Sequence, residues 1–248
     1  MLQIERQDKI LAYVSAKKSA TVNKLAVITH SSQATVRRDL SFMERQGLIR
    51  RTHGGAILFE SSNDETSSNV RINENKQQKE KIAMLTLPLL QNGRTLFFDA
   101  SSTVLAVCKI FDLKYKTVIT NGLLCALSLV EKETLNVIMP SGSLVYNSNS
   151  LIGASTIKTL DTFTPDIAVF SCGGVNGGRV MEATIEGAEI KKTVIAKAKT
   201  KILLVTSNKF NKTLPFETAK CDDFDYIITD CAPDFEQLEF VNNAKILY

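Results

Sequence analysis

The sequence predicts an α/β protein in which a small helical N-terminal domain precedes a larger domain built around a mainly parallel sheet. Three observations lead to this prediction: basic charge confined to the first quarter of the chain, a polar stretch after it, and short apolar runs alternating with helical segments in the rest. With 248 residues, 44% of them hydrophobic, the chain can bury one large core and a second, small one.

The charge is distributed unevenly along the chain. Residues 1–58 hold ten Lys/Arg against four Asp/Glu, a net charge of +6, whereas the remaining 190 residues hold 20 against 22, a net charge of −2. A basic module joined to a near-neutral body indicates a polyanion partner for the module and a different partner for the body. Chance variation of charge in a small domain is the alternative.

Cysteine and histidine usage argues against a metal site. The five cysteines are odd in number and never spaced as C-x-x-C, which is typical of reduced thiols. With only His30 and His53 beside them, we expect no metal and no cofactor. The first ten residues carry four charges, and no apolar run approaches the roughly 18 residues that a membrane span needs, so we expect a soluble, cytoplasmic protein.

Three short helices are expected in the N-terminal domain. The first covers residues 4–15, with Ile4, Ile10, Leu11 and Val14 close to one face, and a lysine-rich turn follows at residues 17–19. Thr21 is the predicted N-cap of the second helix, and Ser32 that of the third, which runs from about 33 to 46 and ends at Gly47. The tight turn between the last two helices is typical of a helix-turn-helix.

The segment GLIRRTHGGAILF predicts two short strands around Gly54 and Gly55, which would form the wing of a winged helix. On the third helix, an angular count at 100° per residue places Val36, Leu40 and Met43 on one buried stripe. The same count points Arg38 away from that stripe and puts Arg37 on its flank.

This separation of the two arginines suits a helix seated in a DNA major groove, where Arg38 would reach a base edge and Arg37 a phosphate. The small Ala34 and the basic wing favour this hypothesis. The alternative is a solvated pair in which Arg38 bridges to Asp39 or Glu44.

The N-terminal sequence resembles the signature of the DeoR family of transcription regulators. The resemblance covers ERQDKILAYV and TVNKLAVITHSSQATVRRDLSFMERQGLIRRTHGGA, with TVRRDL, GLIRR and HGGA as its most specific parts. Ser31 departs from the family, which usually has an apolar residue there. The DNA-binding candidates are Ser32, Gln33, Ala34, Thr35, Arg37, Arg38, Arg50, Arg51 and His53.

A linker is expected after the wing, because FESSNDETSSNV is rich in serine, asparagine and acid. The predicted division is a DNA-binding domain at 1–58, a linker at 59–74 and an α/β domain at 75–248 that begins with a helix. The strands expected in the α/β domain are 95–100, 116–120, 135–140, 167–172, 201–207, 226–230 and 245–248.

Polar groups follow five of these strands, and the carboxyl ends of parallel strands form the ligand crevice of an open sheet. They are Ser101, Ser102 and Thr103 after the first strand, Thr120, Asn121 and Gly122 at the second, Ser141 and Gly142 after the third, Gly173 and Gly174 after the fourth, and Asn208 and Lys209 after the fifth. Helices starting near Thr103 and Asn121 would aim backbone N–H groups at a phosphate. Each group alone is more often a helix N-cap; together they favour a small anionic polyol.

The resemblance extends over nearly the whole chain, through DASST, TN, SLIGASTIKTL, EGAEIKK and TSNKF, which are similar to segments of the DeoR sensor domain. It implies a fold similar to ribose-5-phosphate and glucosamine-6-phosphate isomerases and a phosphorylated sugar as effector. The effector-binding candidates are Asp99, Ser101, Ser102, Thr103, Thr120, Asn121, Gly122, Gly142, Lys191 and Lys209, with Glu189 as a further candidate.

Three departures from the family lie in these segments. Ser101 stands where the family prefers glycine, Ser141-Gly142 replaces a Gly-Gly pair, and Thr206 replaces an aspartate. A side chain in place of glycine restricts how closely a backbone approaches a ligand. The effector is therefore expected to be unusual, to bind weakly or to be absent.

The leading hypothesis is a homo-oligomeric transcription factor, dimer or tetramer, that represses a carbohydrate operon and responds to a sugar phosphate. One alternative is a sugar-phosphate isomerase carrying a helix-turn-helix, with Asp99, Glu186 or Glu189 and Lys209 as acid or base. Another is a DNA-binding protein whose crevice is only structural.

Overall fold

The computed structural model describes residues 2–45, 48–58, 68–233 and 241–248. The chain divides into two compact units, residues 1–71 and 72–248. The boundary falls inside α4 (Ser68–Asn73), so residues 68–73 of the segment expected as a linker are helical. Residues 59–67 of that segment lie outside the described residues, as does Gly47, the expected end of the third helix.

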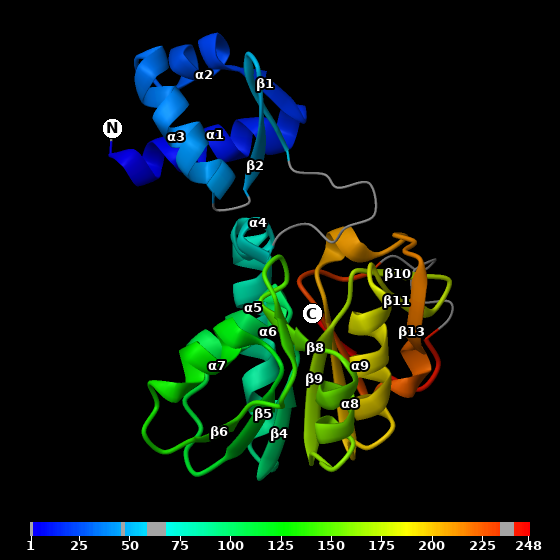
Figure 1. Ribbon diagram of the computed structural model, residues 1–248. Helices are drawn as coiled ribbons and strands as arrows, with labels where there is room; N and C mark the ends of the chain where they lie inside the picture. The colour runs from blue at the N-terminus through cyan, green and yellow to red at the C-terminus, as the bar shows by residue number, and fades with distance from the viewer. Residues whose placement is uncertain (1, 46–47, 59–67, 234–240) are drawn as a thin grey trace. The chain divides into compact units, whose positions relative to one another are not determined.

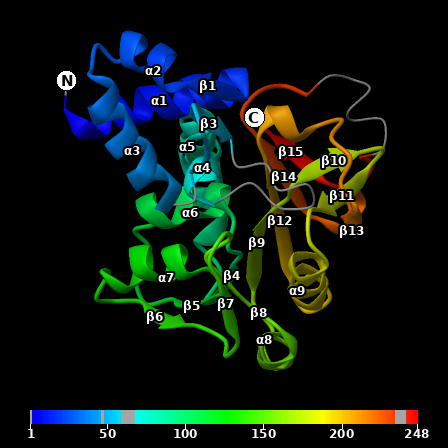
Figure 2. The ribbon, with the colours of Figure 1, turned by 45° about the horizontal axis from the view of Figure 1, so that its top comes forward.

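The N-terminal unit has the three expected helices, α1 (Gln3–Lys17), α2 (Val22–Ile28) and α3 (Gln33–Arg45), as Figures 1 and 2 show. The wing strands β2 (Ile49–Thr52) and β3 (Gly55–Leu58) are also present and pair antiparallel. The sequence missed a third strand, β1 (Ser19–Thr21), which pairs antiparallel with β3. Three residues are too few to show alternation, and the sequence assigned Ser19 to the lysine-rich turn and Thr21 to a helix N-cap.

The small core of this unit confirms most of the expected apolar pattern. It contains Ile10, Leu11, Val14, Val22, Leu25, Val36, Leu40, Met43, Ile49, Ala56 and Val70. Ile4 is an exception, because its side chain is 73% exposed. The apolar pattern of α1 therefore begins at Ile4, before the first buried residues of the helix.

The C-terminal unit is built on a seven-stranded parallel sheet, and all seven expected strands belong to it. Its order is β15-β14-β12-β9-β4-β5-β6. The strands are β4 (Thr95–Phe98), β5 (Thr117–Thr120), β6 (Asn136–Ile138), β9 (Ile167–Ser171), β12 (Thr200–Val205), β14 (Tyr226–Thr229) and β15 (Lys245–Leu247). The chain runs outward from β4 in one direction and later restarts at β9 on its other side. The topological switch point therefore lies between β4 and β9.

Helices cover both faces of this sheet, as Figures 1 and 2 show. One face carries α5 (Lys76–Thr86), α6 (Ser102–Ile110) and α7 (Leu123–Val130), which pack on Leu96, Phe98 and Val169. The other carries α8 (Ala154–Leu160) and α9 (Ile185–Ile195), which pack on Phe97, Ala168 and Phe170. Successive strand residues thus point into opposite cores, as the pleat requires. A 3-10 turn, η1 (Leu87–Leu90), follows α5.

Two small antiparallel sheets accompany the main sheet and were not predicted. One is the hairpin of β7 (Ser143–Val145) and β8 (Ser150–Ile152), and the other joins β10 (Gly174–Asn176), β11 (Arg179–Glu182) and β13 (Phe216–Lys220). Most of these strands have only three or four residues and lie in segments rich in glycine, serine and asparagine, so no apolar run marks them. Two further 3-10 turns are η2 (Ser207–Lys209) and η3 (Cys221–Asp223).

Candidate functional site

The first turn of α3 is the exposed start of the second helix of the helix-turn-helix. Ser32 caps it, because the Ser32 Oγ accepts a hydrogen bond from the Thr35 N–H at 3.1 Å and lies 2.9 Å from the Thr35 Oγ1. Gln33 and Ala34 are exposed beside it. The predicted N-cap is confirmed, and this turn presents small and polar side chains to solvent.

The two arginines of α3 have different surroundings. Val36, Leu40 and Met43 form the buried stripe, each 0% exposed, while Arg37 and Arg38 are exposed. Arg37 reaches back one turn to the Gln33 Oε1 at 3.4 Å. Within the described residues, the Arg38 side chain has no hydrogen bond or ion pair.

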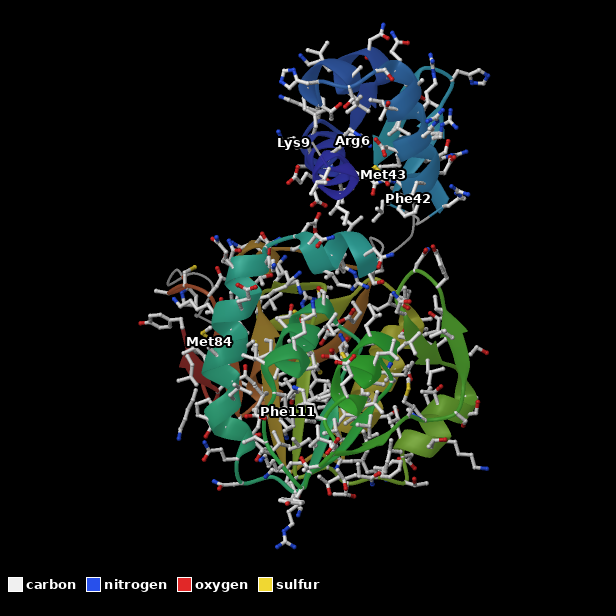
Figure 3. The ribbon with its side chains drawn as sticks, turned by 90° about the vertical axis from the view of Figure 1, so that its left-hand side faces the viewer. Arg6, Lys9, Phe42, Met43, Met84 and Phe111 are labelled. Carbon is white, nitrogen blue, oxygen red and sulfur yellow. The ribbon has the colours of Figure 1, made fainter. Side chains whose placement is uncertain are left out.

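The acidic neighbours of Arg38 are bound elsewhere. Asp39 is only 2% exposed and accepts hydrogen bonds from the Arg6 Nε at 2.5 Å and the Gln7 Nε2 at 3.2 Å. Arg6 projects from α1 toward α3 in Figure 3, so this buried ion pair ties the two helices together. Glu44 accepts a hydrogen bond from the backbone of Arg51 at 2.9 Å. The bridge from Arg38 to Asp39 or Glu44 is therefore absent from the described structure.

The wing presents two arginines in two ways. Arg50 and His53 are exposed, and neither side chain has a hydrogen bond or ion pair among the described residues. Arg51 instead turns to α3, where its guanidinium donates to the Ser41 Oγ at 2.8 Å. The sequence placed Arg50 and Arg51 together at DNA, but the structure gives Arg51 a partner inside the domain.

The second candidate site lies at the switch point of the sheet, between the carboxyl ends of β4 and β9. Asp99 follows β4 and is 1% exposed. Its Oδ1 accepts a hydrogen bond from the Ser101 N–H at 2.8 Å, and its Oδ2 accepts one from the Ser171 N–H at 2.9 Å. The carboxylate thus fixes the turn after β4 and joins it to the end of β9.

Lys191, from α9, lies on the same carboxylate. Its Nζ is 3.2 Å from the Asp99 Oδ2, donates to the Ser171 carbonyl at 2.6 Å and also pairs with Glu182 of β11. Burial lowers the pKa of Lys191, but the carboxylates of Glu182 and Asp99 outweigh it, and the net shift is upward. Sequence reasoning missed Glu182, because it ends a strand that no apolar pattern marks and lies nine residues before its partner.

Lys209 reaches the same point from η2, after β12. Its Nζ donates to the Ser171 Oγ at 3.1 Å, while that hydroxyl donates to the Leu204 carbonyl at 2.7 Å. Thr103, fully buried in the first turn of α6, has its Oγ1 3.4 Å from the same Ser171 Oγ. The structure therefore brings Asp99, Thr103, Lys191 and Lys209 together around Ser171, a residue that the sequence did not single out.

The end of β5 supplies the neighbouring part of the site. The Thr120 Oγ1 accepts a hydrogen bond from the Gly122 N–H at 3.1 Å, and the Asn121 Nδ2 donates to the Leu151 carbonyl at 3.3 Å. The Asn121 Oδ1 is buried and has no hydrogen-bond partner among the described residues. A Cβ on Gly122 would lie 2.8 Å from the Ala100 Cα, so the turns after β4 and β5 touch at this glycine.

Four candidates have mainly structural surroundings. Ser101 is the N-cap of α6, accepting the Val104 N–H at 3.2 Å, and Ser102 is the first residue of that helix. Gly142 has φ +151°, and a Cβ there would lie 2.0 Å from the Thr156 Oγ1, so it packs against α8. Glu189 pairs with Lys192 at 3.2 Å, both about half exposed, rather than with the cluster around Ser171.

Unlike Lys209, the other polar residues after β12 form hydrogen bonds with each other or with β14. The Thr206 Oγ1 donates to the Asn208 Oδ1 at 2.7 Å. Asp230, at the end of the neighbouring β14, accepts hydrogen bonds from the Ser207 N–H at 2.6 Å and the Ser207 Oγ at 2.9 Å. A carboxylate thus approaches this turn from β14, although the turn itself has threonine instead of aspartate.

Among the described residues, no group of three or more His, Cys, Asp or Glu side chains is arranged to hold a metal ion. None of the helices in that part of the chain combines the length and apolar character needed to cross a membrane.

Two family models match the chain. Residues 6–62 match the DeoR-like helix-turn-helix domain, and residues 74–231 match the DeoR C terminal sensor domain. Each match covers one of the two structural units for most of its length. The sequence resemblance to the DeoR family is therefore confirmed in both halves.

Curated relatives match over nearly their full length. The HTH-type transcriptional regulator GolR of Listeria innocua is 31% identical over 93% of this chain and 91% of its own. The HTH-type transcriptional repressor GlcR of Bacillus subtilis is 31% identical over 94% and 91%. The glycerol-3-phosphate regulon repressor of Escherichia coli is 27% identical over 99% and 98%.

Solved structures give a weaker likeness. A D-ribose-5-phosphate isomerase in complex with phospho-erythronic acid aligns with 54% of this chain and 54% of its own, at 14% identity and a TM-score of 0.41. A likeness at this level supports no argument about activity.

Proposed function

Because the chain belongs to the DeoR family of transcriptional regulators, we propose that it represses a carbohydrate operon and is controlled by a phosphorylated sugar bound at the carboxyl ends of β4, β5, β9 and β12. DNA binding resides in the helix-turn-helix. The relatives are named as regulators and not as enzymes, which decides against the isomerase hypothesis.

The proposed DNA contacts come from α3 and the wing. The first turns of a recognition helix reach the base edges, so Ser32, Gln33, Ala34 and Thr35 face the groove with Arg37 and Arg38. Arg38 is the proposed base reader, because it is exposed and no described acidic side chain holds it. Arg50 and His53 contact the phosphates. A two-fold dimer would place two such helices on repeated half-sites.

The observation that supports the effector site is the convergence of side chains on the β4/β9 switch point. Two lysines, a buried carboxylate and a buried hydroxyl meet around Ser171, namely Lys191, Lys209, Asp99 and Thr103. The buried Asn121 Oδ1, on the neighbouring strand end, is an acceptor suited to a ligand hydroxyl. The lysine ammonium groups can bind a phosphate, and the carboxylate and amide oxygens can accept hydrogen bonds from hydroxyls. A sugar phosphate carries both kinds of group. Repression in particular is suggested by the repressor names of two of the relatives.

Ligand binding can be tested by thermal shift with the full chain, comparing ribose 5-phosphate, glucose 6-phosphate and glycerol 3-phosphate with the unphosphorylated compounds. A ligand that binds only the folded state raises Tm, and at a given concentration a tighter ligand raises it more. We expect at least one phosphate ester to raise Tm, its unphosphorylated form to have no effect, and Lys209→Ala to abolish the shift. The same ester should change the affinity for DNA from upstream of the protein's own gene. Saturable binding of none of these esters would count against the proposed effector class.

A second candidate function is a DNA-binding regulator whose crevice is only structural, and two observations favour it. Ser101 caps α6 with its side chain, and Lys191 is paired with two carboxylates of the protein. A regulator with a structural crevice would bind DNA equally well with and without every phosphate ester tested. DNA binding measured with and without saturating ester separates the two functions.

A further inference from the structure

The ammonium group of Lys191 is already paired with the protein's own acceptors. Of its three N–H donors, one donates to the Ser171 carbonyl and one to a carboxylate oxygen of Glu182, and the Nζ also forms an ion pair with the Asp99 Oδ2 at 3.2 Å. Its side chain is 11% exposed, and those of Glu182 and Asp99 are 9% and 2% exposed. Three charged groups are thus buried together with a net charge of −1.

Asp99 and Glu182 have different roles in this group. Asp99 accepts backbone N–H groups from Ser101 and Ser171, so its position is set by the turns after β4 and β9. Glu182 reaches Lys191 from β11, a strand of the small sheet and not of the main one. Its Oε2 would lie 4.0 Å from a Cβ on Gly187, in the first turn of α9. A carboxylate here benefits from the N-terminal end of the α9 dipole, as a bound anion would.

We infer that Glu182 is an internal anion that competes with the effector phosphate for Lys191 and thereby sets the effector concentration to which the protein responds. This inference rests on the proposed function, since it concerns the affinity of the proposed site. A phosphate ester can pair with Lys191 only if the Glu182 carboxylate moves away or the two anions share one cation. Both alternatives reduce affinity, because like charges a few ångströms apart repel strongly where water is scarce.

The chain offers a matched pair of variants. Glu182→Gln removes the charge but keeps the side-chain length and an oxygen that can accept from Lys191, while Asp99 still neutralises the ammonium. Glu189→Gln makes the same charge change on α9, but Glu189 is 49% exposed and pairs with Lys192 instead. Both variants should therefore raise the net charge of the protein by one, but only Glu182→Gln changes the surroundings of Lys191.

The test is calorimetric titration of the full chain, its Glu182→Gln variant and its Glu189→Gln variant with inorganic phosphate, ribose 5-phosphate and ribose. We expect Glu182→Gln to lower the Kd of both phosphate probes by about tenfold, which corresponds to one lost repulsion of moderate strength. Glu189→Gln should leave both constants unchanged, and none of the three proteins should bind ribose more tightly than another. Unchanged Tm in the absence of ligand would show that the Glu182 variant is folded.

Two other outcomes have distinct meanings. If the wild type binds a phosphate probe and Glu182→Gln binds it equally or more weakly, the competition is absent, while the proposed effector class stands. In that case Glu182 would be a ligand for sugar hydroxyls or a structural partner of Lys191. If neither protein binds any phosphate probe, the proposed function itself fails, and the inference fails with it.

Discussion

The Arg51 guanidinium lies 2.8 Å from the hydroxyl of Ser41 and donates a hydrogen bond to it, which ties the wing to α3. Ser41 in turn donates to the carbonyl oxygen of Arg37 at 2.9 Å. The backbone N–H of Arg51 is held by Glu44, and β2 is an edge strand, so this donor would otherwise have no partner in the sheet. Arg51 is therefore suited to position α3 relative to the wing.

The salt dependence of DNA binding should distinguish Arg51 from Arg50. Each phosphate contact adds about 0.9 to the slope of log K against log salt. We expect Arg50→Ala to reduce the slope by about one. Arg51→Ala should weaken binding by several-fold while leaving the slope unchanged. This variant loses the hydrogen bond that orients the wing, but it loses no phosphate contact. Fluorescence anisotropy over a salt series measures both quantities.

Ser41→Ala provides the control for this prediction. If Arg51 acts through Ser41, the double variant should bind DNA no more weakly than Arg51→Ala alone. A reduced slope in Arg51→Ala, together with unchanged binding by Ser41→Ala, would instead identify Arg51 as a phosphate contact, as the sequence suggested.

Arg38 is expected to contribute sequence specificity. Replacing it by alanine should cost about 1 to 3 kcal/mol in binding to the preferred DNA sequence if it makes a bidentate contact to guanine. Arg38→Lys is the sharper variant, since lysine keeps the charge but lacks the fork of two donors. We expect Arg38→Lys to retain non-specific binding and to lose discrimination at one base pair in a selection from randomised DNA. Retained discrimination in both variants would rule out the base-reading role.

The ion pair between Arg6 and Asp39 should stabilise the packing of α1 on α3. Arg6→Ala leaves the Asp39 carboxylate, 2% exposed, with Gln7 as its main partner. Removing one partner of a buried ion pair costs about 3 to 5 kcal/mol. We expect faster hydrogen exchange across α3 and weaker DNA binding. Lys9→Ala, an exposed lysine on the same helix, is the control and should change neither. Equal exchange in the two variants would contradict a stabilising role for the pair.

The sequence was sufficient where a pattern repeats along one element. The strands of the main sheet are apolar runs, and Val36, Leu40 and Met43 recur at helical spacing, so both were predicted correctly. The short strands β1, β7, β8, β10 and β11 have no such run, and their pairing depends on distant partners. Single-sequence patterns contain no information of this kind.

The candidate site shows the same limit at the level of side chains. Strand ends are predictable, and Asp99, Thr103 and Lys209 do meet at one of them. Which lysine is already neutralised is not predictable, because Glu182 reaches Lys191 from an unpredicted strand. Likewise, Arg50 and Arg51 are equivalent in sequence, but only the structure shows that one of them bonds to Ser41.

Asp166 lies at the end of the sheet opposite the candidate effector site. Its ionisation should make the free energy of unfolding of the C-terminal unit depend on pH. Its carboxylate accepts hydrogen bonds from Lys199 at 2.8 Å and from the backbone of Thr95 and Arg94, both at 3.0 Å. The hydrogen bond from Lys199, followed by those from the backbone, lowers the pKa of Asp166 from 3.8 to about 2. The carboxylate thus joins the amino ends of β4, β9 and β12.

A lowered pKa in the folded state means that the ionised form is stabilised by folding. Its contribution is complete above pH 3.8 and is lost as the pH falls toward about 2. We expect Asp166→Asn to lower the free energy of unfolding of the C-terminal unit by about 1 kcal/mol at pH 7, a value reduced for the partial exposure of the side chain. The difference from the wild type should vanish near pH 2. Asp161→Asn, whose carboxylate is 61% exposed and pairs with Lys197, should have little effect at either pH. Urea unfolding at both pH values provides the measurement. If Asp166→Asn is still less stable than the wild type at pH 2, packing and not the charge is responsible for the difference.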